Sequence, residues 1–436
     1  MNKHFKRSKK RLLSRLAWRI RTVFWSGAVL VGMVAAAFAF LSERAEQSFL
    51  LVKEYSFIAS FFLPPLGILV ISKLRSTFFR GSEGSGIPQT IVTLQRKEQN
   101  YLRKSLLSLK ISFGKFGLTL LGLLCGLSIG REGPTVQIGA SIMFSLGRIS
   151  RFPPHYIEKG LILAGGSAGI AAAFNTPIAG IVFAIEELSR SFEEKTSGII
   201  LTAVVIAGMT AVFIHGNYVY FGSVASVLPA TGTGWLAIPF CGVLGGLMGG
   251  LFSQSLIFGG GKLKPFLKSH PLRVAIVCGA IVSLLGLLSS GATFGTGYHQ
   301  TGEIIAGTAD YDPFFPFLKM FASIASYLSG IPGGIFSPSL TAGAGFGADF
   351  YHWFPVASYE TMILLGMLAY FSGVIQSPIT AFVIVMEMTD NPDILLALMA
   401  TAVIAHGASR LVCPVPVYRA MATQFLESQK RLAGSA

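Results

Sequence analysis

The stretch LTLLGLLCGLSIGREGP, residues 118–134, decides how this chain folds. A run of apolar and small residues leads into a break made of glycine and proline, and the break contains an arginine and a glutamate. In lipid, an interrupted helix leaves backbone N–H and C=O groups unpaired, and these are tolerated only where they are buried in protein or line a wet cavity. The stretch therefore predicts a broken helix at membrane depth, which is typical of a transport site.

The composition of the whole chain agrees with a membrane protein. Of its 436 residues, 52% are hydrophobic and 13% are charged, whereas an ordinary soluble domain is roughly a quarter charged. A helix needs about 20 apolar residues to cross a bilayer. Long apolar runs recur at 22–40, 118–129, 160–185, 198–214, 236–258 and 394–412. We predict an all-α, polytopic integral membrane protein without a separate soluble domain.

The charge of the chain is concentrated at its start. Residues 1–21 carry nine Lys or Arg and no Asp or Glu, and the formal net charge is +15. The apolar run that follows is long for a signal peptide and lacks a cleavage site, so we interpret 1–21 as a basic cytoplasmic tail before a retained helix. With the mildly basic tail at 426–436, this predicts both termini in the cytoplasm. The charge indicates topology and contact with the lipid bilayer, and no nucleic acid partner is expected.

The helix breaks occur twice, in the same order. The first half contains GSGIPQ (84–89), GREGP (130–134), TPI (176–178) and then Glu186. The second half contains GTGYHQ (295–300), GIFSP (334–338), SPI (377–379) and then Glu387. Such duplication is typical of secondary transporters, whose site lies where the repeats meet. We predict a first repeat at 22–214, a connection at 215–233 and a second repeat at 234–425; spacing alone leaves parallel and inverted repeats open.

The repeated breaks have the chemistry of anion sites. Proline is favoured in a first helical turn, and the free N–H groups there, together with the positive end of the helix dipole, attract anions. Several converging helix starts could replace the hydration shell of a halide without a fixed Lys or Arg, and hydroxyls from Ser85 or Tyr418 could add donors. The alternative for any single cluster is a kink or a close helix contact.

Acidic residues inside the apolar regions are a second signal. A carboxylate within a membrane costs roughly 2.5 to 3.5 kcal/mol on insertion scales and is a functional candidate. Glu132 stands at an anion-binding helix start, where it could compete with the anion when charged and leave when protonated. Its alternative is a salt bridge to Arg131 or a role in stabilising the helix dipole. For Glu186 and Glu187, the alternative is a helix end that reaches the cytoplasm.

Other patterns are weaker. The sequence GGSAG at 165–169 matches the nucleophile elbow of serine hydrolases, but its neighbours form a small-residue helix face, so we expect packing rather than catalysis by Ser167. The four cysteines, Cys125, Cys241, Cys278 and Cys413, show no paired spacing, and the histidines show no metal-ligand spacing. We expect no metal, no cofactor and no enzyme.

The three motifs at 84–88, 130–134 and 334–338 together resemble the anion-filter motifs of the CLC chloride channels and proton/chloride antiporters, and the resemblance covers about 26–425. It implies a homodimer in which each subunit has its own anion pathway and two inverted halves. It also implies an anion site at Ser85, Gly86, Ile335, Phe336 and Tyr418. Glu132 matches the external gating glutamate of the family, and Glu187, the second acid of its pair, matches the internal proton glutamate of its antiporters.

The resemblance predicts electrogenic exchange of chloride for protons, because both proton glutamates are kept. A passive chloride channel on the same scaffold stays open, and an intramembrane hydrolase using Ser167 is a distant third hypothesis. Ser85 is the residue usual in chloride-selective members, and with Phe336 it argues against the fluoride-exporting branch. Gln89 departs from the family, because the first motif usually ends in Glu. We expect no cytoplasmic CBS pair after Tyr418.

Overall fold

The structure, a computed structural model, describes residues 15–95, 100–150, 154–189, 194–216, 218–226 and 232–433. Its regular elements throughout these ranges are helices, and seven of the helices are long and apolar enough to cross a bilayer. The predicted all-α, polytopic fold is confirmed. Residues 1–14 of the predicted N-terminal tail and 434–436 of the C-terminal tail lie outside the described residues.

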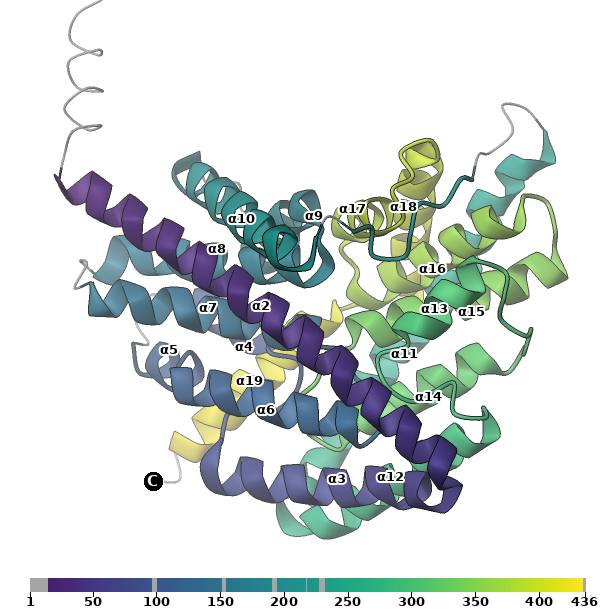
Figure 1. Ribbon diagram of the computed structural model, residues 1–436, viewed down its shortest axis with the longest axis horizontal. Coiled ribbons are helices and arrows are strands. Elements are labelled where there is room, and N and C mark those ends of the chain that lie inside the picture. Colours follow the sequence, from purple (N-terminus) through teal and green to yellow (C-terminus); the bar gives the residue numbers. More distant parts are fainter. Residues whose placement is uncertain are drawn as a thin grey trace, which may run out of the picture.

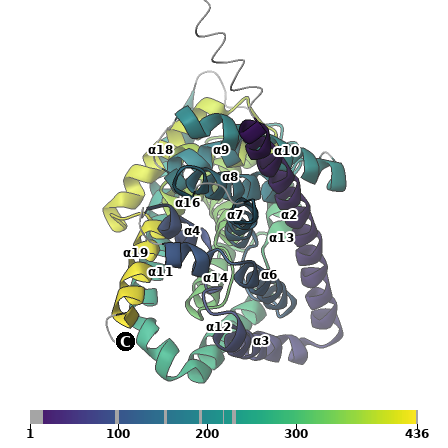
Figure 2. The ribbon, with the colours of Figure 1, turned by 90° about the vertical axis from the view of Figure 1, so that its left-hand side faces the viewer.

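The first repeat forms one side of the bundle, purple to teal in Figure 1. Its elements are α2 (Arg15–Tyr55), α3 (Phe57–Phe78), α4 (Ile87–Gln95), α5 (Asn100–Leu106), α6 (Leu109–Leu124), α7 (Glu132–Ile149), α8 (Pro154–Phe174), α9 (Pro177–Phe183), the π-helical turn η1 (Ala184–Ser189) and α10 (Glu194–His215). The long helix α2 runs along one side of the molecule, whereas α7 lies inside it (Figure 2).

The second repeat, green to yellow, forms most of the other side. Its elements are η2 (Thr233–Leu236), α11 (Ala237–Ser269), α12 (Pro271–Leu288), α13 (Tyr298–Ile305), α14 (Phe315–Leu328), α15 (Phe336–Trp353), α16 (Tyr359–Ile375), α17 (Pro378–Thr389), α18 (Leu395–Val412) and α19 (Val417–Ala433). Helix α19 crosses back and packs against α4 of the first repeat, so the two repeats are interlocked.

The repeats meet at equivalent residues of the second and third motifs. The Gly130 N–H donates to the Gly334 carbonyl at 2.8 Å, and the Gly334 N–H donates to the Gly130 carbonyl at 2.6 Å. This reciprocal pair is antiparallel, so a local twofold axis relates the two loops, and α7 and α15 leave it in opposite directions. The repeats are therefore inverted, which answers the question that spacing left open.

The break before the short helices has the same shape in both halves. Asn175 and Gln376 have φ of 56° and 54°, in the left-handed region that is uncommon for residues other than glycine and that asparagine tolerates better than most. The next residues, Thr176 and Ser377, share φ −125° and nearly the same ψ, 81° and 82°. Each is followed by a proline at the first helical position, where the missing N–H costs nothing.

Small residues allow the inner helices to pack closely. A Cβ on Gly139 of α7 would collide with the Gly165 carbonyl of α8, and a Cβ on Gly165 would collide with the Gly139 carbonyl. In the second repeat, a Cβ on Gly366 of α16 would likewise collide with the backbone of Gly347 in α15. Close approach through small residues is the usual way in which membrane helices associate. The packing interpretation of 165–169 agrees with this contact.

Candidate functional site

Four helix starts from the two repeats meet in the interior of the bundle. They are the start of α4 after Ser85 and Gly86, the start of α7 at Glu132, the start of α15 at Phe336 and the start of α19 at Val417. Each start leaves backbone N–H groups without an intrahelical partner. The convergence therefore concentrates N–H donors and positive dipole ends at one place.

Glycines let the first two starts touch. Gly86 has φ +102°, a conformation that favours glycine, and a Cβ there would press on the Gly133 carbonyl at 2.9 Å. A Cβ on Gly133 would collide with the Ser85 hydroxyl. A larger residue at either glycine would push α4 away from α7, so the close approach depends on both.

The second repeat completes the cluster. Ile335 and Phe336 are both 1% exposed at the start of α15. The Phe336 ring lies 5.8 Å from the Tyr418 ring, and the Tyr418 hydroxyl lies close to Ser85. The structure thus brings together the residues predicted to bind the anion, whose binding role stays a prediction.

Two hydroxyls in this cluster are unsatisfied. The side chains of Ser85 and Tyr418 are fully buried, and neither hydroxyl oxygen has a hydrogen-bond partner of normal geometry among the described residues. Leaving a buried donor unpaired costs about 1–3 kcal/mol. Both donors face the converging helix starts, so the residues present fit an anion as their missing partner.

Buried lysines hold the glycine loops that precede the helix starts. The Lys115 ammonium donates to the Gly84 carbonyl at 2.9 Å and the Glu83 carbonyl at 3.4 Å. Lys319, its counterpart in the second repeat, donates to the carbonyls of Gly295 at 2.9 Å and Thr293 at 3.1 Å. Both lysines are fully buried, and they direct their donors to backbone.

Gln89, the departure from the family motif, also holds the first loop. Its side-chain amide donates to the Glu83 carbonyl at 2.6 Å. An ionised glutamate has no proton to donate in this way. Gln89 therefore adds a side-chain hydrogen bond, besides those from Lys115, to the loop that carries Ser85.

Glu132 is fully buried at the start of α7. The Ser337 hydroxyl donates to its Oε1 atom at 2.7 Å, and a Cβ on Gly130 would collide with its Oε2 atom. Arg131 instead donates to the Ala39 carbonyl at 2.6 Å, and in the described part of the chain it forms no ion pair with Glu132. The salt-bridge alternative is therefore wrong, and the carboxylate is held at the repeat junction by Ser337.

The two neighbouring acids of η1 have different surroundings. Glu187 is 1% exposed, and the Ser377 hydroxyl donates to it at 2.5 Å. Glu186 accepts from the backbone N–H groups of Ile379 and Thr380 at 3.2 and 2.7 Å, at the start of α17. Glu187 is thus buried inside the protein, whereas Glu186 is partly exposed in η1. A π-helical turn is frequent at functional sites, and here it carries both carboxylates.

Glu387 repeats the role of Glu186 in the other half. It accepts from the backbone N–H groups of Ile178 and Ala179 at 3.1 and 2.7 Å, at the start of α9. Each repeat therefore caps the short helix of the other. Glu186 and Glu387 occupy equivalent positions in the two repeats because each of them caps the short helix of the other repeat.

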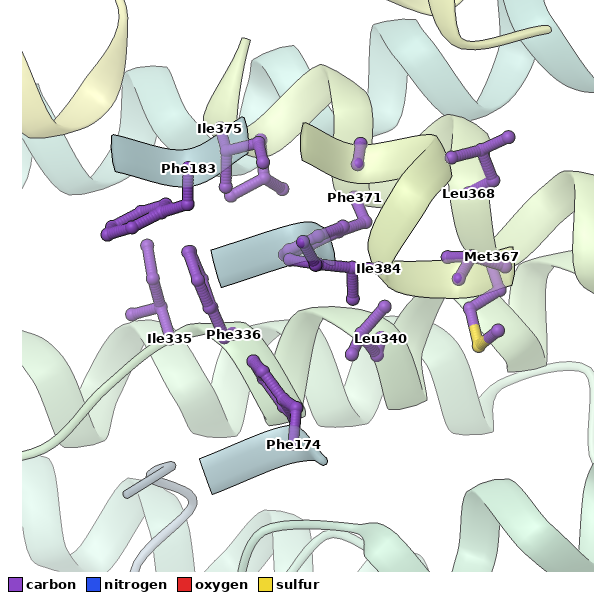
Figure 3. Packing of buried hydrophobic residues seen from close by; sticks show 14 of the residues in the cluster. Phe174, Phe183, Ile335, Phe336, Leu340, Met367, Leu368, Phe371, Ile375 and Ile384 are labelled. Atoms are coloured by element: carbon purple, nitrogen blue, oxygen red, sulfur yellow. The ribbon is translucent and has the colours of Figure 1, made fainter. Parts of the chain in front are cut away.

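Aromatic rings surround Phe336 (Figure 3). Phe174 stacks on it with ring centres 6.2 Å apart, and Phe183 and Phe371 meet it edge to face at 6.1 and 5.1 Å. These rings come from α8, α9 and α16. They form an apolar layer beside the unsatisfied hydroxyls, and Tyr418 lies within electrostatic range of both Glu132 and Glu187.

The hydrolase hypothesis disagrees with the position of Ser167. The residue is fully buried in the middle of α8 and donates to the carbonyls of Leu163 at 2.8 Å and Ala164 at 3.1 Å. A nucleophile elbow needs a strand, a sharp turn and a helix. The Ser167 hydroxyl instead donates to backbone carbonyls of its own helix, α8.

Sequence reasoning assigned no role to several residues of the site. They are Lys115, Lys319, Ser337 and Ser377. The two lysines interrupt apolar stretches at matching places in the repeats, which is a signal that the duplication could have exposed. The two serines stand inside quoted motifs, but only the fold shows that each donates to a glutamate of the other repeat.

Comparison with known proteins gives consistent results. Residues 66–410 match the family described as voltage gated chloride channel. The chain is 30% identical over 406 residues to an H(+)/Cl(-) exchange transporter of Yersinia pseudotuberculosis, with 88% of this chain and 80% of that protein covered. The Yersinia pestis protein of the same name is also 30% identical, over 404 residues.

Solved structures show the same fold. A slow cyanobacterial Cl-/H+ antiporter has a TM-score of 0.84 at 22% identity, covering 94% of this chain and 99% of the other. A eukaryotic CLC transporter has a TM-score of 0.77 at 19% identity, covering 93% of this chain and 74% of the other.

Proposed function

The chain belongs to the CLC family of voltage gated chloride channels and exchangers, and we propose that it exchanges chloride for protons across the membrane. One observation carries the proposal: two buried glutamates, Glu132 and Glu187, each accept a hydrogen bond from a serine of the opposite repeat, beside a single cluster of unsatisfied anion donors. The curated relatives are named as H(+)/Cl(-) exchange transporters, which supports the same activity.

Chloride binds at the converging helix starts. The hydroxyls of Ser85 and Tyr418 donate to it from opposite repeats, and the backbone N–H groups of Ile335 and Phe336, with the loop at Gly86, complete the site. Helix dipoles and neutral donors hold the ion without a direct lysine or arginine contact. Binding of this moderate kind lets the ion leave again.

Glu132 couples the anion to the proton. Its charged carboxylate competes with chloride for the donors at the repeat junction, and protonation weakens that competition. Glu187 takes protons from the cytoplasm, and Glu132 exchanges them with the outside. Because oppositely charged ions move in opposite directions, each cycle moves net charge, and the exchange is electrogenic.

The protein is an integral membrane protein, and we place it in a bacterial inner membrane with both termini in the cytoplasm. The repeats then run over 22–214 and 234–425, joined by the connection at 215–233. We also propose a homodimer whose contact face includes exposed apolar side chains on α9, α10, α17 and α18, such as Ile178, Met209, Ile379 and Val403 at 52%, 67%, 49% and 63% exposure. These four helices gather along one edge of the bundle (Figure 1).

Purified protein in proteoliposomes tests the function. A chloride gradient is imposed across the vesicles, and the external pH and the chloride efflux are recorded together. We expect the chloride gradient to drive protons against their own gradient. Chloride flux without proton movement would instead support the passive channel, because the same anion donors serve both activities.

A further inference from the structure

Tyr327 lies at the end of α14, between the two elements that carry the unsatisfied hydroxyls. Its hydroxyl donates to the Met421 sulfur at 2.9 Å, and Met421 follows Tyr418 by one turn of α19. On its other side, the same hydroxyl borders the loop that carries Ser85, because a Cβ on Gly84 would approach it to 3.3 Å. One side chain therefore contacts both elements of the anion site.

The loop that carries Ser85 is fixed to the chain segment that follows Tyr327. The Gly84 N–H donates to the Ile331 carbonyl at 3.1 Å, and the Gly333 N–H donates to the Gly84 carbonyl at 3.3 Å. That segment leads from α14 into α15. The end of α14, this loop and the start of α15 thus form one unit that is joined by backbone hydrogen bonds.

Helix α19 meets this unit through side chains. In the described part of the chain, no backbone hydrogen bond joins α19 to the unit, and the Tyr418 ring makes an apolar contact with Phe336. The hydroxyls of Ser85 and Tyr418 have no partner of normal geometry there either, so they do not fix their own spacing. The bond from Tyr327 to Met421 supplies a directed polar contact across the boundary.

The chemistry of this bond suits a positioning role. The aromatic ring of Tyr327 is rigid and partly buried, and Met421 is 8% exposed. A thioether is a weak acceptor on a flexible side chain, so the bond guides α19 without locking it. Binding groups need to be held within about 0.5 Å of their productive geometry, whereas a transport site must also release its ion. A weak, directed bond one turn from Tyr418 meets both requirements.

We propose that Tyr327 is a positioning residue for the chloride site. Through Met421, it holds α19 at the spacing at which the hydroxyls of Ser85 and Tyr418 both reach one anion. Two donors at a fixed spacing discriminate between anions of different radius, whereas a loosened pair adapts to a larger ion. The inference rests on the chloride site of the proposed function, and it adds the residue that sets the affinity and the size preference of that site.

Chloride and bromide titrations of the full-length protein in detergent, followed by calorimetry, test this role. Tyr327→Phe keeps the ring and removes the donor, and Met421→Leu keeps an apolar side chain of similar volume and removes the acceptor. A neutral hydrogen bond changes an equilibrium constant by roughly twofold to tenfold, and sulfur is a weak acceptor, so we expect either variant to weaken chloride binding about threefold. Binding of the larger bromide should weaken less, so the ratio of bromide to chloride affinity rises.

A double variant and a control separate positioning from a general loss of stability. Donor and acceptor form one bond, so the double variant should bind chloride no more weakly than either single variant. Tyr370→Phe is the matched control, because it removes a buried hydroxyl from a ring that packs on Phe252 and Phe346. It should bind both anions as the wild type does.

Four results would overturn the inference. They are wild-type chloride affinity in Tyr327→Phe, equal weakening of both anions, losses that multiply in the double variant, and a change of the same size in Tyr370→Phe. A wild-type protein that binds no chloride would instead overturn the proposed function itself, and this titration comes first.

Discussion

Replacing Glu186 or Glu387, the glutamates that cap the short helices α17 and α9, should destabilise the protein by a calculable amount. Glu387 accepts two backbone N–H groups at the start of α9, and Glu186 accepts two backbone N–H groups and the Thr380 hydroxyl at the start of α17. Loss of a helix cap costs about 0.5–2 kcal/mol, and a carboxylate near a helix N-terminus adds about 0.3–1 kcal/mol. Both side chains are partly exposed, so we expect about 2 kcal/mol for each change to alanine.

The double replacement should cost less than the sum of the two. Helices α9 and α17 pack against each other, and each glutamate ties one helix to the other. Residues that share an interface in this way usually couple by about 0.5–3 kcal/mol. Once one glutamate is removed, α9 and α17 are held together less firmly. The remaining glutamate then contributes less to the free energy of unfolding.

Denaturant unfolding in detergent micelles, followed by tryptophan fluorescence, measures these free energies. The variants are Glu186→Ala, Glu387→Ala and the double replacement. The control is Glu54→Ala, which removes an exposed glutamate of α2. Surface substitutions usually change stability by less than about 0.5 kcal/mol. Single cap variants within that range of wild type would refute the reasoning, and so would strictly additive losses.

Three further predictions concern transport. Glu187→Val should keep chloride flux and abolish proton movement in the proteoliposome assay, because it removes the cytoplasmic proton acceptor; retained proton pumping would contradict the role. Glu132→Gln should make chloride flux independent of pH, since a neutral amide cannot be titrated. A pH dependence that persists in this variant would show that another residue is the gate. Lys115→Met should weaken chloride binding in calorimetry, because the loop that carries Ser85 loses its ties to Gly84 and Glu83. Unchanged chloride affinity would show that Gln89 alone positions the loop.

The sequence predicted which residues meet at the converging helix starts, because these residues are marked by backbone chemistry. Glycine and proline clusters at 84–88, 130–134 and 334–338 interrupt apolar runs and can therefore be recognised in the sequence. The hydroxyl partners of the glutamates were not visible in this way. Ser337 and Ser377 look like ordinary helix-start residues, and each donates to a carboxylate from which about 200 residues of chain separate it.

Glu186 and Glu187 show the limit of spacing as a guide. Both acids lie in the same turn, and only the resemblance to the CLC family favoured Glu187 over Glu186 as the internal proton glutamate. The π-helical turn directs Glu187 to Ser377 inside the protein and Glu186 to the start of α17. Which side of a turn a residue faces depends on the helix that packs there, and sequence periodicity does not contain that information.

The GREGP stretch at 130–134, by itself, determined that a helix breaks inside the membrane, because proline and glycine act locally on the backbone and lipid cannot satisfy the freed groups. The duplication of such breaks determined that two repeats exist. Only the tertiary structure decided that the repeats are inverted and that Arg131 turns away from Glu132 toward Ala39. Those outcomes depend on long-range packing between helices, which is fixed by the shapes of both partners together.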